Sequence, residues 1–107
     1  MSKIEEIVKK MAKAVNVSAG EIIGRSRRQP VAAARQCVCY IAYNHGYTYD
    51  EIGGFIDRDR VTVYHSVLLT KDRLKAKDLL THRIMEEYMN TLGRRTLEGG
   101  EGKGLRR

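Results

Sequence analysis

The chain has 107 residues, of which 42% are hydrophobic, and it carries a formal net charge of +7 at pH 7. This length suits one domain and is too short for two. No apolar run approaches the ~20 residues that cross a membrane, and the N-terminal region does not resemble a signal peptide, so we expect a cytoplasmic protein. The two cysteines, Cys37 and Cys39, are too few for a zinc site, and on one helix their side chains point roughly 200° apart and cannot form a disulfide, so we expect reduced thiols.

The first two predicted helices lie before a basic loop. Apolar residues recur at helical spacing from Ile4 to Val15 and predict an amphipathic helix over residues 3–14. Ser18 and Glu21 have the spacing of a capping box and predict a short helix from Ser18 to about Gly24. The segment that follows, GRSRRQP, is too polar and too basic to belong to the core.

A third helix is predicted from Val31 to Asn44, after the only proline of the chain and before Gly46. Thr48 and Glu51 form a second capping box and predict a fourth, short helix. That helix contains Gly53 and Gly54, each of which costs up to ~1 kcal/mol relative to alanine. We therefore expect both glycines to pack closely against the next helix.

The fifth predicted helix begins after Asp57 or Asp59, either of which can cap it, and runs to about Lys77. Its core-facing stripe is Val63, Val67, Thr70 and Leu74. A last helix is predicted from Leu79 to Leu92, and we expect residues 93–107 to form a flexible basic tail. The prediction is an all-α domain over residues 1–92, with about six helices including a helix-turn-helix.

Positive charge is concentrated in two parts of the chain. Residues 25–35 carry four arginines and no acid, and residues 58–77 carry six lysines or arginines against two aspartates. Residues 36–57 carry three acids and no lysine or arginine. Two basic patches that the fold brings onto one surface are typical of a phosphate-binding protein, although either patch alone is also compatible with an ordinary solvated face.

The start of the fifth helix is the strongest candidate for base recognition. Arg60, Val61, Thr62 and His65 fall largely off its core-facing stripe. A helix that is anchored by one face and carries a cation and a methyl-bearing residue at its tip is shaped to enter a DNA major groove. In this hypothesis Arg60 binds a guanine, Val61 contacts a thymine methyl and Asp59 accepts a hydrogen bond from a cytosine amine.

The run Ile52–Ser66, IGGFIDRDRVTVYHS, resembles the signature of the C-terminal DNA-binding domain (domain IV) of the bacterial replication initiator DnaA. The upstream blocks Asn16–Arg27 and Arg35-Gln36 also resemble this family, and the resemblance covers about residues 4–75. Two departures are visible: Arg60-Val61 stands where the family has His-Thr at base-contacting positions, and Ala34 stands where it has proline. The matches to the signature are Ile52, Gly53, Arg58, Asp59, Thr62, Val63 and His65.

The resemblance implies a helix-turn-helix that docks on duplex DNA as a monomer. It also implies that the loop before the third helix places a basic residue in the minor groove. Strict counting puts Gln29 at that position, which makes Arg28 a shifted candidate and Arg27 a weaker one. Together with the hypothesis above, the predicted DNA-binding residues are Arg27, Arg28, Arg35, Gln36, Arg58, Asp59, Arg60, Val61, Thr62, His65 and Lys71.

We predict sequence-specific binding of double-stranded DNA, in an accessory or regulatory role in replication or transcription. The chain has no recognisable catalytic pair, metal motif or nucleotide loop, so we expect neither an enzyme nor a cofactor. Two other hypotheses remain open: an RNA-binding adaptor, and a module that binds a replication or transcription protein. The hydroxyl groups of several tyrosines can either reach phosphate or lie at the wet edge of half-buried rings; these are Tyr40, Tyr43, Tyr47, Tyr49 and Tyr64.

Overall fold

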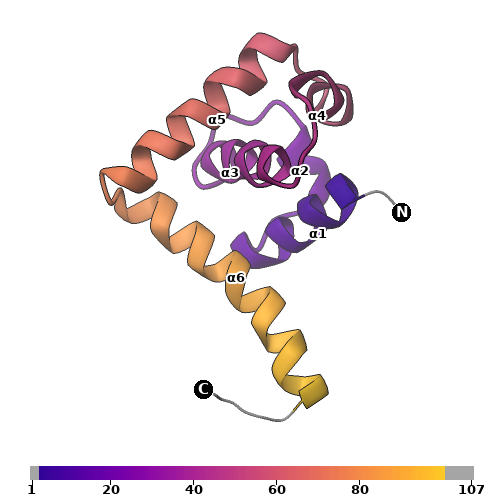
Figure 1. The fold of residues 1–107 in the computed structure, drawn as a ribbon, viewed down its shortest axis with the longest axis vertical. Coiled ribbons are helices and arrows are strands. Elements are labelled where there is room, and N and C mark those ends of the chain that lie inside the picture. The colour runs from indigo at the N-terminus through magenta and orange to yellow at the C-terminus, as the bar shows by residue number, and fades with distance from the viewer. Residues whose placement is uncertain (1–2, 101–107) are drawn as a thin grey trace.

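A computed structural model describes residues 3–100 of the chain, and these residues form helices and connecting turns without a strand (Figure 1). The predicted all-α fold with about six helices is confirmed. None of the helices within residues 3–100 has the length and apolar character needed to cross a membrane. The helices are α1 (Lys3–Val15), α2 (Ala19–Ile23), α3 (Val31–Asn44), α4 (Tyr49–Ile56), α5 (Arg60–Lys75) and α6 (Leu79–Gly100).

The predicted helix starts are confirmed by their caps. Ser18 and Glu21 form a reciprocal capping box at α2, and Thr48 and Glu51 form another at α4. In each box the hydroxyl accepts from the backbone N–H of the glutamate, whose carboxylate accepts from the backbone N–H of the capping residue. These bonds pair amides at the start of each helix, where the regular i→i−4 pattern provides no carbonyl.

α3 is the central helix and contacts each of the other five (Figure 1). Its sequence permits this because its buried positions include small residues such as Ala33, Ala34 and Ala42, which let neighbouring backbones approach. Cys37 and Cys39 are also buried there as free thiols. Burial raises the pKa of Cys37 to about 12 and that of Cys39 to about 11, so both stay protonated and unreactive at neutral pH.

The predicted end of the last helix at Leu92 is wrong, because α6 continues to Gly100. Each residue added to an existing helix gains a backbone hydrogen bond, and this propagation outweighs the glycine-rich composition on which the prediction depended. The rest of the predicted tail, residues 101–107, lies outside the described residues. α5 ends at Lys75, slightly before the end predicted at about Lys77. Lys77 adopts a left-handed conformation in the turn to α6.

The turn between α4 and α5 requires glycine at position 53, whereas position 54 does not need to be glycine. Asp57 has a left-handed φ of 58°, and the next residue, Arg58, donates its backbone N–H to the Gly53 carbonyl at 2.9 Å. A Cβ on Gly53 would lie 2.3 Å from the Arg58 carbonyl oxygen and 3.5 Å from Val63 Cγ2. The predicted close packing is therefore confirmed for Gly53. For Gly54 it is wrong, because a Cβ there would meet nothing within 4 Å.

This difference predicts opposite effects for two adjacent substitutions. Gly54→Ala should raise the free energy of unfolding by about 0.5–1 kcal/mol, because alanine is the better helix former and its methyl group enters open space. Gly53→Ala should lower it by about 1–3 kcal/mol, because a backbone carbonyl must move. Urea unfolding measures both. A gain in stability from both variants would show that the turn does not need the close approach at Gly53.

Candidate nucleic-acid interface

Asp59 is the N-cap of α5, and it is one of the two residues predicted for this position. Its Oδ1 accepts a hydrogen bond from the Thr62 backbone N–H at 2.8 Å. This backbone bond holds the pKa of the Asp59 carboxyl below its usual value, and a bond from the Thr62 hydroxyl group adds a smaller effect in the same direction. The cap fixes where the helix begins and so places Arg60 and Val61 at its tip.

The two faces of α5 divide as the sequence predicted. Val63, Val67 and Thr70 are buried in the core, whereas the residues at the tip are exposed, Val61 by 56%. Arg60 Nε lies 3.8 Å from Asp50 Oδ1, and both side chains are largely exposed. A surface pair of this length is weak, so the Arg60 guanidinium remains available to a ligand. The exposed members of the predicted set on this helix are Arg60, Val61, Thr62, His65 and Lys71.

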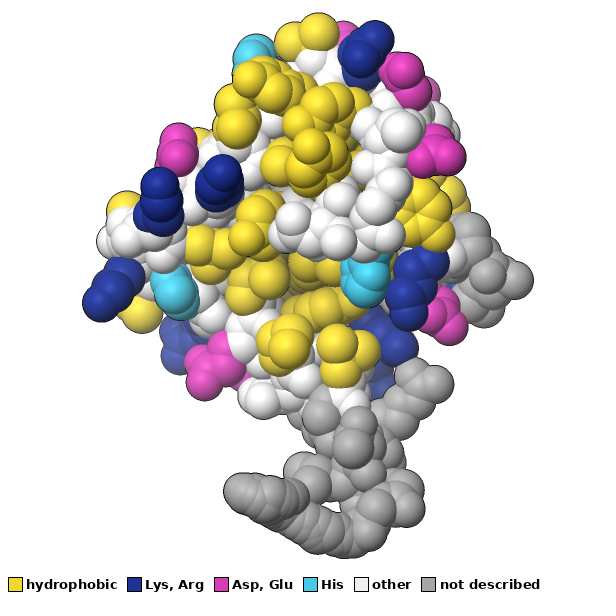
Figure 2. All heavy atoms as spheres, in the orientation of Figure 1, with side chains coloured by type: hydrophobic (Ala, Val, Ile, Leu, Met, Phe, Trp, Pro, Cys, Tyr) yellow, Lys and Arg dark blue, Asp and Glu magenta, His cyan; other side chains and the backbone are white. Residues whose placement is uncertain are grey.

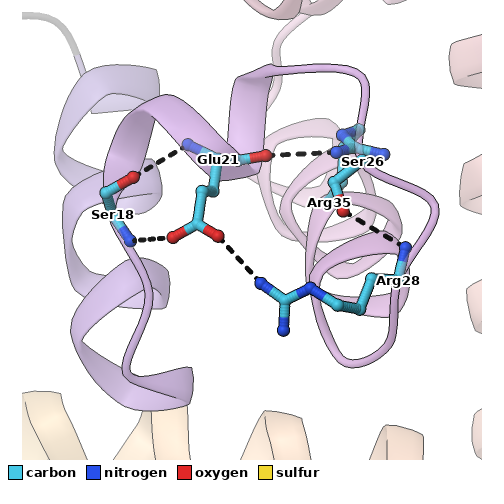
Figure 3. A network of polar contacts seen from close by, with 5 residues as sticks. All are labelled: Ser18, Glu21, Ser26, Arg28 and Arg35. Atoms are coloured by element: carbon cyan, nitrogen blue, oxygen red, sulfur yellow. Dashed lines mark hydrogen bonds and ion pairs between the residues drawn. The ribbon is translucent and has the colours of Figure 1, made fainter.

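Two arginines bind the C-terminal carbonyl groups of α2. Arg35 of α3 donates from Nε to the Ile22 carbonyl. It also donates from Nη2 to the Glu21 carbonyl at 3.2 Å (Figure 3). Arg58, in the turn between α4 and α5, donates from Nη2 to the Gly24 carbonyl. The last carbonyls of a helix have no partner inside it, and a cation there is favoured by the helix dipole.

These bonds join the basic loop to the helix-turn-helix. Arg58 also donates from Nη1 to the carbonyls of Ile56 and Asp57, at 3.0 and 3.2 Å, so one guanidinium links the end of α2 to the end of α4. Arg25 adds an exposed ion pair with Asp57, with 3.3 Å between Nη2 and Oδ2. The start of the basic loop therefore lies beside the turn that presents α5.

Arg35, Gln36 and Arg58 were predicted to contact DNA, and the structure gives each of them internal bonds. All three are partly buried. Gln36 Oε1 accepts from Arg73 Nη1 at 2.7 Å. Burial lowers the pKa of Arg35, and the nearby charge of Arg58 lowers it further, but a guanidinium stays charged at neutral pH. No spacing rule could have indicated the bonds of Arg35 to Ile22, Arg58 to Gly24 and Gln36 to Arg73, because they join residues 13 to 37 positions apart.

The loop side chains differ in what they contact. Arg28 Nη2 binds Glu21 Oε2 at 2.9 Å, and the Arg28 backbone N–H donates to Ser26 Oγ at 3.2 Å (Figure 3). Gln29 Oε1 accepts from the Ala33 backbone N–H at 3.0 Å and so helps to start α3. Arg27 is exposed and makes no polar side-chain contact within residues 3–100. From the sequence, Arg27 was a weaker candidate than Arg28. The geometry instead favours Arg27 as the loop arginine whose side chain is available to a ligand.

An exposed, capped helix tip behind a tight turn, with a basic loop held beside it, defines the class of small helix-turn-helix DNA-binding domains. The family model described as bacterial dnaA protein helix-turn-helix matches residues 4–68, and the chain belongs to this family. The structure and this match confirm the resemblance seen in the sequence, and DNA binding follows from it.

Two relatives are both named chromosomal replication initiator protein DnaA. The one from Thermotoga petrophila is 28% identical over 100 residues, which cover 92% of this chain and 23% of the relative. The one from Bacteroides thetaiotaomicron is 31% identical over 85 residues, which cover 78% of this chain and 18% of the relative. The chain thus spans less than a quarter of the length of these curated relatives.

The internal bonds of Arg58 predict a large effect on stability for Arg58→Ala. Three carbonyls lose a charged donor, which should lower the free energy of unfolding by about 1.5–3 kcal/mol. Arg27→Ala is the matched control, since it removes the same charge from an exposed side chain and should change stability by less than about 0.5 kcal/mol. Urea unfolding compares the two. Equal effects would mean that the Arg58 bonds do not stabilise the fold.

The cap at Asp59 predicts a response to acid. Because its folded-state pKa lies below the unfolded value of ~3.9, its contribution to stability is complete above that value and is lost as the pH falls through the lowered pKa. Asp59→Asn keeps an acceptor oxygen but does not titrate. Between about pH 5 and pH 2, its melting temperature should fall less than that of the wild type. Parallel curves for the two proteins would contradict this role.

Proposed function

We propose that the domain binds double-stranded DNA in a sequence-specific manner, with the tip of α5 in the major groove. The observation that supports this most is the exposure of Arg60 and Val61 at the start of a helix whose opposite face is buried. Helix-turn-helix proteins use these first positions of the recognition helix to contact base edges. The loop over residues 24–30 then lies on the DNA backbone or in the minor groove.

Three residues at the tip are proposed to read bases. The guanidinium of Arg60 offers two donors to guanine O6 and N7, and the methyl groups of Val61 pack on a thymine methyl. Asp59 Oδ1 accepts the helix-cap bond, and Oδ2 is proposed to accept from a cytosine amine. Because Arg60 and Val61 replace the His-Thr pair of the family signature, we propose a target sequence that differs from that of the initiator.

The remaining candidates are proposed to bind phosphate or to position those that do. Arg27, Thr62, His65 and Lys71 are exposed and can contact phosphate directly, and Arg28 can do so if it leaves Glu21. The internal bonds of Arg35, Gln36 and Arg58 suit residues that hold the surface in shape. Any phosphate contact by these three is secondary.

The names of the relatives suggest where such binding acts. Both are chromosomal replication initiator proteins, and we propose that this domain binds at a replication origin, or regulates replication or transcription at related sites in the cytoplasm. One copy is proposed to bind each site, with no catalytic role and no cofactor. A replication or transcription protein is proposed as a further partner.

Selection of bound duplexes from random DNA, followed by substitution, tests this function. Arg60→Ala should weaken binding to the selected duplex by about 1–3 kcal/mol and binding to a scrambled duplex much less. Arg27→Ala should weaken both duplexes to a similar extent and reduce the slope of log affinity against log salt by about 0.9. An equal loss on every sequence for Arg60→Ala would exclude it as a base reader.

The same assay separates the alternatives. Tighter binding to structured RNA than to any duplex at fixed salt would identify an RNA-binding adaptor. A partner protein that binds the Arg60→Ala variant as well as the wild type, with little dependence on salt, would identify a protein-interaction module. Either outcome would overturn the proposal.

A further inference from the structure

Three tyrosines from three different helices form one cluster on the surface. Tyr43, near the end of α3, stacks on Tyr49 of α4, with ring centroids 4.8 Å apart and planes 7° from parallel. Tyr49 also contacts Tyr64 of α5 edge-on, at 5.4 Å and 81°. Tyr43 and Tyr64 are 41% and 42% exposed. Figure 2 shows hydrophobic side chains gathered on the visible face where α4 and α5 meet, with charged side chains at their margin.

The cluster continues into a row of cations along α5. Tyr64, Leu68, Lys71 and Lys75 follow one another at spacings of four, three and four residues, so they lie on one face of the helix. Leu68 is 39% exposed, and both lysines are exposed. From Tyr64 to Lys75 this face extends for ~16 Å. Open aromatic rings and positive charge thus lie side by side.

The stacked pair leaves room for another planar group. Tyr49 covers one face of the Tyr43 ring, and Tyr43 nevertheless remains 41% exposed. A hydrogen bond between the two side chains, together with burial, raises the pKa of Tyr49, so its hydroxyl stays neutral. Neutral, already aligned rings stack on a nucleobase at little cost in side-chain entropy.

We propose that this surface, formed by Tyr43, Tyr49 and Tyr64 with Lys71 and Lys75, binds single-stranded DNA. Bases would stack on the open faces of Tyr43 and Tyr64, and the two lysines would neutralise phosphates. Aromatic platforms beside a basic track are the recurring means of binding single strands without sequence preference. A second copy of this chain fits less well, because its +7 charge would bring like charges together.

This site shares Lys71 with the proposed duplex interface, but its three tyrosines and Lys75 lie outside the residues proposed to contact duplex DNA. On α5, Tyr64 lies four residues after Arg60 and three after Val61, so the single-strand surface begins beside the helix tip and runs from there toward Lys75. Tyr43 and Tyr49 belong to α3 and α4 and are not part of the proposed duplex contacts. Substitutions at Tyr43 therefore test the single-strand site without removing a residue assigned to duplex recognition.

Two substitutions at one position separate stacking from packing. Tyr43→Leu keeps an apolar side chain without a ring, whereas Tyr43→Phe keeps the ring. In fluorescence anisotropy with labelled oligo(dT), the leucine variant should bind about 5- to 100-fold more weakly and the phenylalanine variant within about twofold of the wild type. Both should unfold in urea as the wild type does and bind the selected duplex unchanged.

Two further measurements sharpen the test. The chain has no tryptophan, so its intrinsic fluorescence comes from tyrosine and should be quenched when oligo(dT) stacks on the cluster. Lys75→Gln should reduce the slope of log affinity against log salt by about 0.7, the value for one phosphate of a single strand. An unchanged slope would remove Lys75 from the site.

Several results would overturn the proposal. One is the absence of oligo(dT) binding by the wild type, and another is an equal loss of oligo(dT) affinity in the leucine and phenylalanine variants. Tighter binding to oligo(U) than to oligo(dT) would make RNA the ligand. Self-association that Tyr43→Leu abolishes, measured by sedimentation, would make a second copy the occupant. Failure of duplex binding is seen separately with the selected duplex and Arg60→Ala, so the two proposals fail independently.

Discussion

The recognition surface depends on the binding of two guanidinium groups to the C-terminal carbonyls of α2. A helix of five residues is too short to be stable by itself, and its last carbonyls need partners. Arg35 supplies them from α3 and Arg58 from the turn before α5. Because both side chains are partly buried, solvent and salt screen these bonds less than they screen surface ion pairs.

The positively charged side chains of the domain fall into two sets. One set, which includes Arg35, Arg58 and Arg73, is used inside the protein and holds the basic loop and the helix-turn-helix at a fixed separation. The other, which includes Arg27, Arg60 and Lys71, remains exposed. The net charge of +7 therefore overstates what is available to phosphate, since part of it stabilises the fold.

The tyrosine cluster illustrates how the same helix can serve two surfaces. α5 is buried along Val63, Val67 and Thr70, is partly buried at Ser66, Arg73 and Leu74, and is exposed at its other residues. The N-terminal tip carries the residues proposed to read bases, and Tyr64 with Lys71 and Lys75 follows along the helix toward its C-terminal end. Because Tyr43 and Tyr49 come from other helices, only the packing of α3, α4 and α5 creates this second surface.

The sequence by itself determined what local spacing controls. Apolar periodicity gave the helices, capping boxes gave the starts of α2 and α4, and the signature around Arg58–His65 indicated the DNA-binding class. The tertiary structure decided the rest: the internal bonds of Arg35, Gln36 and Arg58, the exposed side chain of Arg27, the different needs of Gly53 and Gly54, and the tyrosine cluster. Each of these depends on atoms that the fold brings together, often from residues far apart in the chain, and no periodicity along the sequence encodes such a distance.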